Sequence, residues 1–226
     1  MAPVDGARLT RIGQEIWSAD RELMLAAAYR LPVRMVVLRA PGRRLLCYSP
    51  VRIDPETLEA LQGLGEVGWL AVPNRLHTTF LPEAREAFPG AEVIGCADEA
   101  CVSTEGLQGA HGLGGFVDCH VVRGYRGFRE LVLYHDASET LVLSDLMVNF
   151  TAGEPWLEWW LKLNGAWGRP SQTRLRKLRL VHDPLALDGL YRWAMARPFR
   201  QISLSHGGII REDAREIFYQ HFRAGR

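Results

Sequence analysis

The sequence carries almost no net charge and few cysteines, and each shortage excludes a class of function. Its 27 basic and 26 acidic residues leave a formal charge of +1. No overall field would therefore draw the protein to nucleic acid, and no nucleic-acid partner is expected. The chain has four cysteines, and they lack the paired spacing of a thiolate zinc site. Metal binding through thiolates is therefore not expected.

The chain also lacks a long apolar run of the length that a membrane-spanning helix needs. The first 15 residues carry charges and have no apolar segment of the kind that a secretory signal contains. We therefore expect no transmembrane segment and a reducing, cytoplasmic location. Cys47 and Cys119 lie within apolar runs and are expected to act as small hydrophobic residues. Cys96 and Cys101 share one polar loop, and the sequence leaves open whether they are bonded.

What the chain does contain is enough apolar material for a folded core. Hydrophobic residues make up 47% and charged residues 23% of the sequence, a balance that is typical of globular proteins and excludes disorder. A chain of 226 residues can bury one sizeable core. The sequence shows no internal repeat and no linker-like stretch, so we expect one domain over residues 1–226.

Short strands separated by turns are predicted for much of the chain. Arg34–Leu38 and Arg44–Ser49 flank a Pro-Gly turn and are expected to form a hairpin. A helix is predicted over Pro55–Leu64, because Asp54 can cap it, proline takes its first position and Gly65 follows its end. Further strands are expected at 14–19, 68–72, 92–95, 116–122 and 200–205, and helices at 83–88 and 212–223. Residues 154–197 are expected to be mainly helical, with breaks at Gly165–Pro170 and at Asp183-Pro184.

A second hairpin is predicted from Glu130–His135 and Thr140–Ser144, with its turn at residues 136–139. This register places Glu130 opposite Asp145. Like charges directly opposite each other destabilise a sheet. The repulsion would have to be offset by a cation, by a nearby arginine such as Arg129, or by protonation of one carboxyl.

Three polar residues share one feature, which is that each closes an apolar, strand-like run: His77, Asp145 and His206. Ligands bind at strand ends in open α/β sheets, and two imidazoles with a carboxylate suit Zn, Fe or Mn. The alternative is that each is a surface or hydrogen-bonded loop residue. His135 is not expected to join them, because it lies at the far end of the hairpin, about 16 Å from Asp145 at the usual rise per residue.

Seven segments spread over nearly the whole chain carry a joint pattern. They are Met35–Leu38, Tyr48–Pro50, Val72–Asn74 with His77, Glu130–His135, Thr140–Leu146 with Asn149, Leu163–Ala166 and Ser205–Gly207. Taken together they resemble a family of unassigned function within the metallo-β-lactamase superfamily. The resemblance implies an α/β protein with a four-layer αββα sandwich and a site at one edge between the two sheets.

The chain departs from the metal-binding motif of that superfamily, which usually reads His-x-His-x-Asp-His after a strand. If Asn74 precedes the motif, His77 matches its second histidine. Arg75, Thr79 and Phe80 then stand at the positions of the first histidine, the aspartate and the last histidine. A shift of one residue in this alignment would also remove the match of His77.

The remaining ligand positions are matched in part. The next histidine of the superfamily lies in a glycine-rich turn, where this chain has Tyr125. The bridging aspartate and the final histidine are matched by Asp145 and His206. The resemblance therefore implies a reduced, mononuclear site for one Zn, Fe or Mn ion held by His77, Asp145 and His206. Additional groups at that site would come from Glu130, Tyr125 and Asn74.

Two functions follow from this resemblance. The first is a metal-dependent hydrolase of a small molecule, with a metal-activated water as nucleophile and no organic cofactor. Loss of the motif aspartate removes the group that would orient this water or accept its proton. The second is a non-catalytic relative that binds a small anionic ligand or a protein partner in the same crevice.

The segment 156–179 combines aromatic and basic residues. Four tryptophans, Trp156, Trp159, Trp160 and Trp167, are followed by Arg169, Arg174, Arg176, Lys177 and Arg179. The more common arrangement is a helix that packs its tryptophans on the core and turns its arginines to water. The alternative is a lid or an interface for an anionic ligand, a membrane surface or a second copy of the chain.

Overall fold

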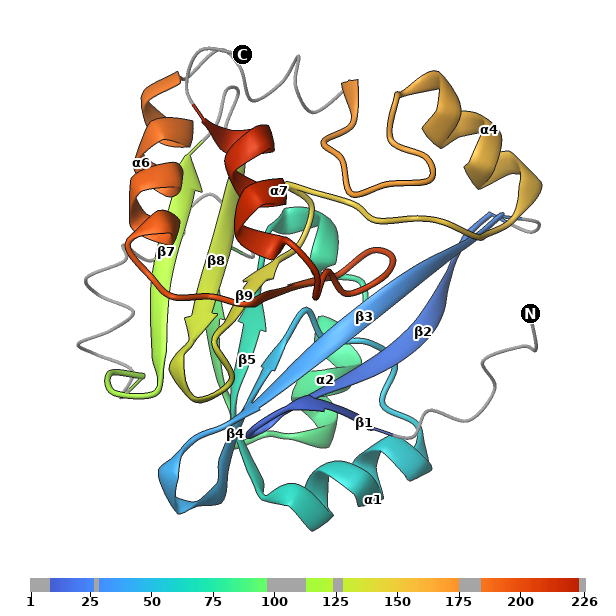
Figure 1. Ribbon diagram of the computed structural model, residues 1–226. Coiled ribbons are helices and arrows are strands. Elements are labelled where there is room, and N and C mark those ends of the chain that lie inside the picture. The colour runs from blue at the N-terminus through green and yellow to red at the C-terminus, as the bar shows by residue number, and fades with distance from the viewer. Residues whose placement is uncertain (1–8, 27–28, 97–112, 124–127, 175–183, 224–226) are drawn as a thin grey trace.

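The structure is a computed structural model that describes residues 9–26, 29–96, 113–123, 128–174 and 184–223. Its strands form two sheets, one with the order β1-β2-β3-β4-β5-β6 and one with the order β10-β9-β8-β7 (Figure 1). The first sheet contains β1 (Thr10–Gly13), β2 (Ile16–Ala26), β3 (Tyr29–Arg39), β4 (Arg44–Tyr48), β5 (Glu66–Val72) and β6 (Glu92–Gly95). The second contains β7 (Val117–Arg123), β8 (Arg129–His135), β9 (Thr140–Leu143) and β10 (Gln201–Leu204).

Helices α1 (Pro55–Leu64) and α2 (Leu81–Ala87) cover the outer face of the first sheet, and α6 (Pro184–Met195) and α7 (Ala214–Phe222) cover that of the second. A further helix, α4 (Pro155–Leu163), packs on a separate apolar cluster. Leu61 of α1 and Ala84 of α2 pack on the first sheet, and Leu190 of α6 and Phe218 of α7 pack on the second. In Figure 1, α6 and α7 accordingly stand beside β7, β8 and β9.

Three separate apolar cores define the layers. Alternation along β3 turns Val36 toward the core between the sheets and Val37 toward the core under α1 and α2. Leu133 of β8 faces the same central core as Val36, whereas Val132 faces α6 and α7. The order of layers is therefore helix, sheet, sheet, helix, which confirms the predicted four-layer sandwich.

Parallel pairing brings particular strand ends to the same edge. β4, β5 and β6 pair in parallel in the first sheet, and β9 and β10 pair in parallel in the second. The carboxyl ends of neighbouring parallel strands lie side by side. The segments that follow β4 and β5 therefore lie together, as do those that follow β9 and β10, and the contact of His77 with Ser144 joins the two edges.

Helix α1 begins and ends where its local signals predict. The Asp54 carboxylate accepts a hydrogen bond of 2.8 Å from the backbone N–H of Thr57, which is the expected N-cap. At the other end, the N–H of Gly65 donates to the carbonyl of Leu61. A Cβ at Gly65 would lie 1.9 Å from the carbonyl oxygen of Arg43, so only glycine fits there.

The N-terminal strands are longer than predicted. In place of one strand over 14–19, β1 ends at Gly13, and β2 begins at Ile16 and pairs with β3 along most of its length. The charged residues of β2 concealed this pairing in the sequence. Arg21 is buried because it binds the carboxylate of Asp54 at 2.7 Å and the hydroxyl of Thr57. A buried charge with such partners is tolerated in a sheet.

Helical structure over 154–197 is interrupted more widely than expected. Helix α4 ends at Leu163, and residues 164–173 run as turns and isolated bridges. Trp156, Trp160 and Trp167 pack partly buried against a fourth apolar cluster that includes Leu157 of α4. This agrees with the packed-helix interpretation for three of the tryptophans, whereas Trp159 is 67% exposed. Arg169 and Arg174 are also exposed. Arg176, Lys177 and Arg179 lie outside the described residues.

Two cysteines behave as the sequence predicts. Cys47 and Cys119 are free and buried, and burial raises the pKa of each thiol to about 12. They are therefore inert apolar residues at neutral pH. Cys101, the cysteine that shares a loop with Cys96, lies outside the described residues. None of the described helices has the length and apolarity to cross a membrane.

Candidate metal centre

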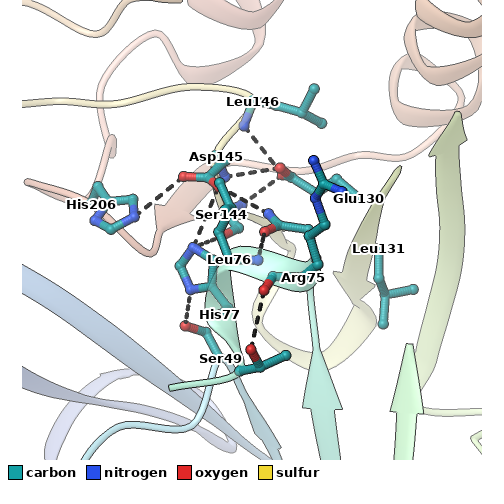
Figure 2. Close-up of polar contacts among 12 residues, drawn as sticks. Ser49, Arg75, Leu76, His77, Glu130, Leu131, Ser144, Asp145, Leu146 and His206 are labelled. Atoms are coloured by element: carbon teal, nitrogen blue, oxygen red, sulfur yellow. Dashed lines mark hydrogen bonds and ion pairs between the residues drawn. The ribbon is translucent and has the colours of Figure 1, made fainter. Parts of the chain in front are cut away.

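The three residues singled out by their strand-end positions come together in the structure (Figure 2). His77 ends the short turn η2 (Arg75–His77) after β5, Asp145 follows β9, and His206 follows β10. One ligand atom from each lies within 4.8 Å of the other two. Within the described part of the chain, this is the one group of three or more potential ligand side chains at such distances. The group bridges the ends of both sheets.

The two nitrogens of His206 have different environments. Nδ1 lies 3.1 Å from the carbonyl oxygen of Pro32, which can only accept, so Nδ1 carries the proton of this bond. Nε2 lies 3.3 Å from Oδ1 of Asp145. In neutral His206, the Nε2 lone pair would face a carboxylate oxygen. A cation between or on these atoms, either a proton or a metal ion, would turn this repulsion into attraction.

The turn that holds His206 needs glycine. Gly207 has a φ of 90°, and a Cβ there would lie 2.1 Å from the carbonyl oxygen of Asn149. The N–H of Asn149 in turn donates to the carbonyl of His206 at 3.2 Å. This close approach of two backbone segments fixes the direction in which His206 points.

His77 is held by two serine hydroxyls. Its Nδ1 lies 2.9 Å from Oγ of Ser49, and its Nε2 lies 2.9 Å from Oγ of Ser144 and 3.6 Å from Oδ2 of Asp145. A hydroxyl can donate or accept, so these contacts allow Nδ1–H to donate to Ser49 and Nε2 to serve as a ligand. Ser49 directly follows β4 and has a φ of 58°, which a non-glycine residue seldom adopts.

Asn74 positions the carboxylate of Asp145. Its side-chain Nδ2 donates to Oδ2 of Asp145 at 3.0 Å, and its Oδ1 accepts from the N–H of Leu76 at 2.9 Å. The second bond caps the short turn that presents His77. Asn74 is thus a supporting residue, because its side chain binds Asp145 and the backbone.

Glu130 supports the backbone that carries Asp145. Residues 135 and 140 are paired, as the predicted register requires. The fully buried carboxylate of Glu130 accepts backbone N–H groups from Ser144 at 2.8 Å, Asp145 at 2.9 Å and Leu146 at 3.3 Å. These three bonds offset the predicted repulsion in a way that the sequence did not reveal, and they turn the Glu130 carboxylate toward the loop backbone.

The other expectations about the site have different outcomes. His135 lies at the end of β8 that is remote from Glu130, and its ring is hydrogen-bonded to Ser138. It is therefore not part of the ligand group, as the sequence predicted. Tyr125 lies outside the described residues. Ser49 and Ser144 were not predicted as site residues. Ser49 directly follows β4 and Ser144 directly follows β9, so their positions at strand ends could have identified them.

Comparison with known proteins places the fold. No family model matches the chain, and no curated protein matches its sequence. Among solved structures, a metallo-β-lactamase from Pseudomonas aeruginosa in its mono-zinc form matches with a TM-score of 0.65 and 11% identity, covering 96% of this chain and 94% of that chain. A metallo-β-lactamase from Pontibacter korlensis matches with a TM-score of 0.58 and 14% identity over 97% of this chain and 100% of that chain. A diflavin flavoprotein fragment from Nostoc matches with a TM-score of 0.62 and 8% identity over 95% and 94%.

These matches define the architecture. The chain has the metallo-β-lactamase fold along nearly its whole length, as the joint sequence pattern implied. At identities of 8 to 14%, the likeness extends to the fold and no further. Resemblance to one family of unassigned function within the superfamily stays a prediction.

Proposed function

We propose that the protein is a metal-dependent hydrolase of a small molecule with one metal ion per chain. His77, Asp145 and His206 would hold that ion. The observation that carries the proposal is the arrangement of His206, whose Nδ1 binds a carbonyl while its Nε2 faces the Asp145 carboxylate at 3.3 Å. Two imidazoles and a carboxylate form a donor set that suits Zn, Fe or Mn.

The donor set fits one ion better than two. A dinuclear site of this fold would take further ligands from the motif after β5, where the chain has Arg75, Thr79 and Phe80. Neither a guanidinium nor a phenyl ring is a metal ligand. The described residues offer three clustered ligand side chains. Three protein ligands leave a position for a water, as in catalytic zinc sites.

The chain's own residues would orient the ligands. Ser49 holds the ring of His77, Asn74 holds the carboxylate of Asp145, and the Pro32 carbonyl fixes the tautomer of His206. Such supporting bonds set ligand direction and basicity. A divalent ion at these ligands would supply a Lewis acid and a water of lowered pKa. His77, Asp145 and His206 also line a cavity of about 320 Å³, which has room for a small substrate.

Elemental analysis of protein purified without chelators tests the proposal. We expect close to one equivalent of a transition metal per chain, and less than a tenth of that in Asp145→Ala and His206→Ala. Asp118→Ala is the matched control, because Asp118 pairs with Arg197 at the second sheet, away from the site. Two equivalents would show that the ligand count is wrong. Absence of metal after reconstitution would favour a non-catalytic binding protein.

A further inference from the structure

The cavity beside the candidate metal ligands has walls that are mainly apolar. The hairpin formed by β2 and β3 contributes one wall, and the segments after β4 and before α2 contribute another. The apolar side chains that line it include Leu23, Leu25, Leu31, Val33, Val51 and Phe80. His77, Asp145 and His206 also line this space, so an occupant of the cavity would contact the ligand group.

The charge of the lining argues against an anionic occupant. The described residues that line the cavity include no lysine or arginine, and they include one acidic residue, Asp145. A carboxylate or phosphate on the ligand would therefore find no ammonium or guanidinium partner in these walls. Burying an unpaired charge against apolar side chains is costly. The walls fit an uncharged group.

The cavity opens to the surface through exposed apolar side chains. Leu25 on β2 and Leu76 in η2 both line it, and they are 54% and 63% exposed. Large apolar side chains at the mouth of a ligand-sized cavity are a surface that a bound apolar chain would cover. The opening therefore has the same chemical character as the interior.

We propose that the cavity binds an uncharged aliphatic acyl group, with its carbonyl end at His77, Asp145 and His206. The substrates would then be neutral esters of aliphatic acids. Hydrolysis adds the oxygen of water to the acyl carbon, breaks the bond between that carbon and the ester oxygen, and returns a proton to the departing alcohol. The choice of substrate rests on the proposed hydrolase function, whereas binding of the acyl group does not.

Binding of straight-chain primary amides, from acetamide to decanamide, tests the inference without catalysis. Measured by calorimetry, the affinity should rise about fourfold for each added methylene until the cavity is filled. With excess chelator present, so that no metal ion offers a partner to an anion, carboxylates of the same chain length should bind at least tenfold more weakly than the amides. Affinity that does not depend on chain length, or tighter binding of the carboxylates under these metal-free conditions, would overturn the inference.

Three variants locate the effect. Leu25→Asn and Leu76→Asn should flatten the dependence on chain length, and both should fold because these side chains are more than half exposed. Leu185→Asn is the matched control, because Leu185 is an apolar residue of α6 that is 80% exposed and is not part of the cavity lining. It should retain the full dependence. A full dependence in both Leu25→Asn and Leu76→Asn would place the acyl group elsewhere and refute the assignment.

Hydrolysis of p-nitrophenyl esters of increasing chain length separates this inference from the proposed function. Amide binding that strengthens with chain length, together with no metal-dependent hydrolysis, would support the acyl site and refute the hydrolase. Metal-dependent hydrolysis at a rate independent of chain length would support the hydrolase and refute the acyl site.

Discussion

Ser49 is one of the two serines whose hydroxyls orient the ring of His77. Its hydroxyl lies 2.9 Å from Nδ1 of His77, and its backbone adopts a φ of 58° so that the side chain turns into the site just after β4. A non-glycine residue in this conformation carries strain that surrounding structure must offset. The strain and the contact with His77 occur at the same residue, so two substitutions are needed to separate them.

We predict that Ser49→Ala and Ser49→Gly both lower metal affinity by about 10- to 100-fold, the usual effect of losing a bond that orients a ligand. Ser49→Gly should be the more stable of the two, because glycine adopts a positive φ without strain. Competition with a chromophoric chelator measures the affinity, and urea unfolding measures the stability. Ser138→Ala, which removes a hydroxyl beside His135 instead, is the control. Wild-type affinity in both Ser49 variants would show that the hydroxyl does not orient the ligand.

At the level of single elements, the hairpin of β8 and β9 contains a buried histidine far from the candidate site. His135 is 1% exposed, its Nδ1 lies 2.7 Å from Oγ of Ser138, and its Nε2 has no hydrogen-bond partner among the described residues. Burial lowers the pKa of His135 from 6.5 to about 4, against smaller upward effects of the Asp136 and Glu15 carboxylates. The native hairpin therefore holds this imidazole neutral.

This lowered pKa predicts acid sensitivity with a defined sign. Between pH 6.5 and 4 the unfolded chain binds a proton at residue 135 and the native chain does not, so the free energy of unfolding falls as the pH is lowered through this window. The loss should reach about 3 kcal/mol at most. Urea unfolding of the wild type and of His135→Gln at several pH values measures it, and the variant should show the shallower dependence. His120, whose pKa is also lowered to about 4, contributes equally to both curves. Parallel curves would refute the assignment to His135.

Elements with local signals were predictable from the sequence, and elements that depend on distant partners were not. Helix α1 was predicted to the residue, because Asp54, Pro55 and Gly65 act within the helix and its ends. The full length of β2 was missed, because Arg21 is buried by partners more than 30 residues away. No pattern within β2 reveals such a contact.

The same distinction holds for the candidate site. Its three central residues were predictable because strand ends can be recognised locally and because their joint pattern resembles a known superfamily. The contact of Ser49 with His77 joins segments 28 residues apart. The three hydrogen bonds that the Glu130 carboxylate accepts from backbone N–H groups depend on the shape of the loop after β9. The first contact arises only when β4 and β5 pair in parallel, and the second depends on the path of the chain beyond the end of β9, so the register of the β8–β9 hairpin could not predict them.

At the scale of the whole molecule, the candidate ligands connect the two sheets. His77 follows a strand of the first sheet, and Asp145 and His206 follow strands of the second. An ion bound to all three would contact the native arrangement alone, because the unfolded chain does not bring the three residues together. Metal binding should therefore stabilise the complete sandwich by mass action.

We predict that free metal at 100 times its Kd raises the free energy of unfolding by about 2.7 kcal/mol. For a chain of this size that corresponds to a rise in Tm of roughly 5 to 10 °C. Excess chelator should remove the rise in the wild type and have no effect on Asp145→Ala or His206→Ala, which have already lost a ligand. Asp118→Ala should keep the wild-type response, because Asp118 pairs with Arg197 and does not belong to the ligand group. Differential scanning calorimetry with and without chelator measures all four proteins.

If the Tm of the metal-reconstituted wild type does not respond to chelator, the sandwich is stable without a bound ion. Asp145 is then held by protein groups that include Asn74 and the histidines, and metal-dependent hydrolysis must be abandoned.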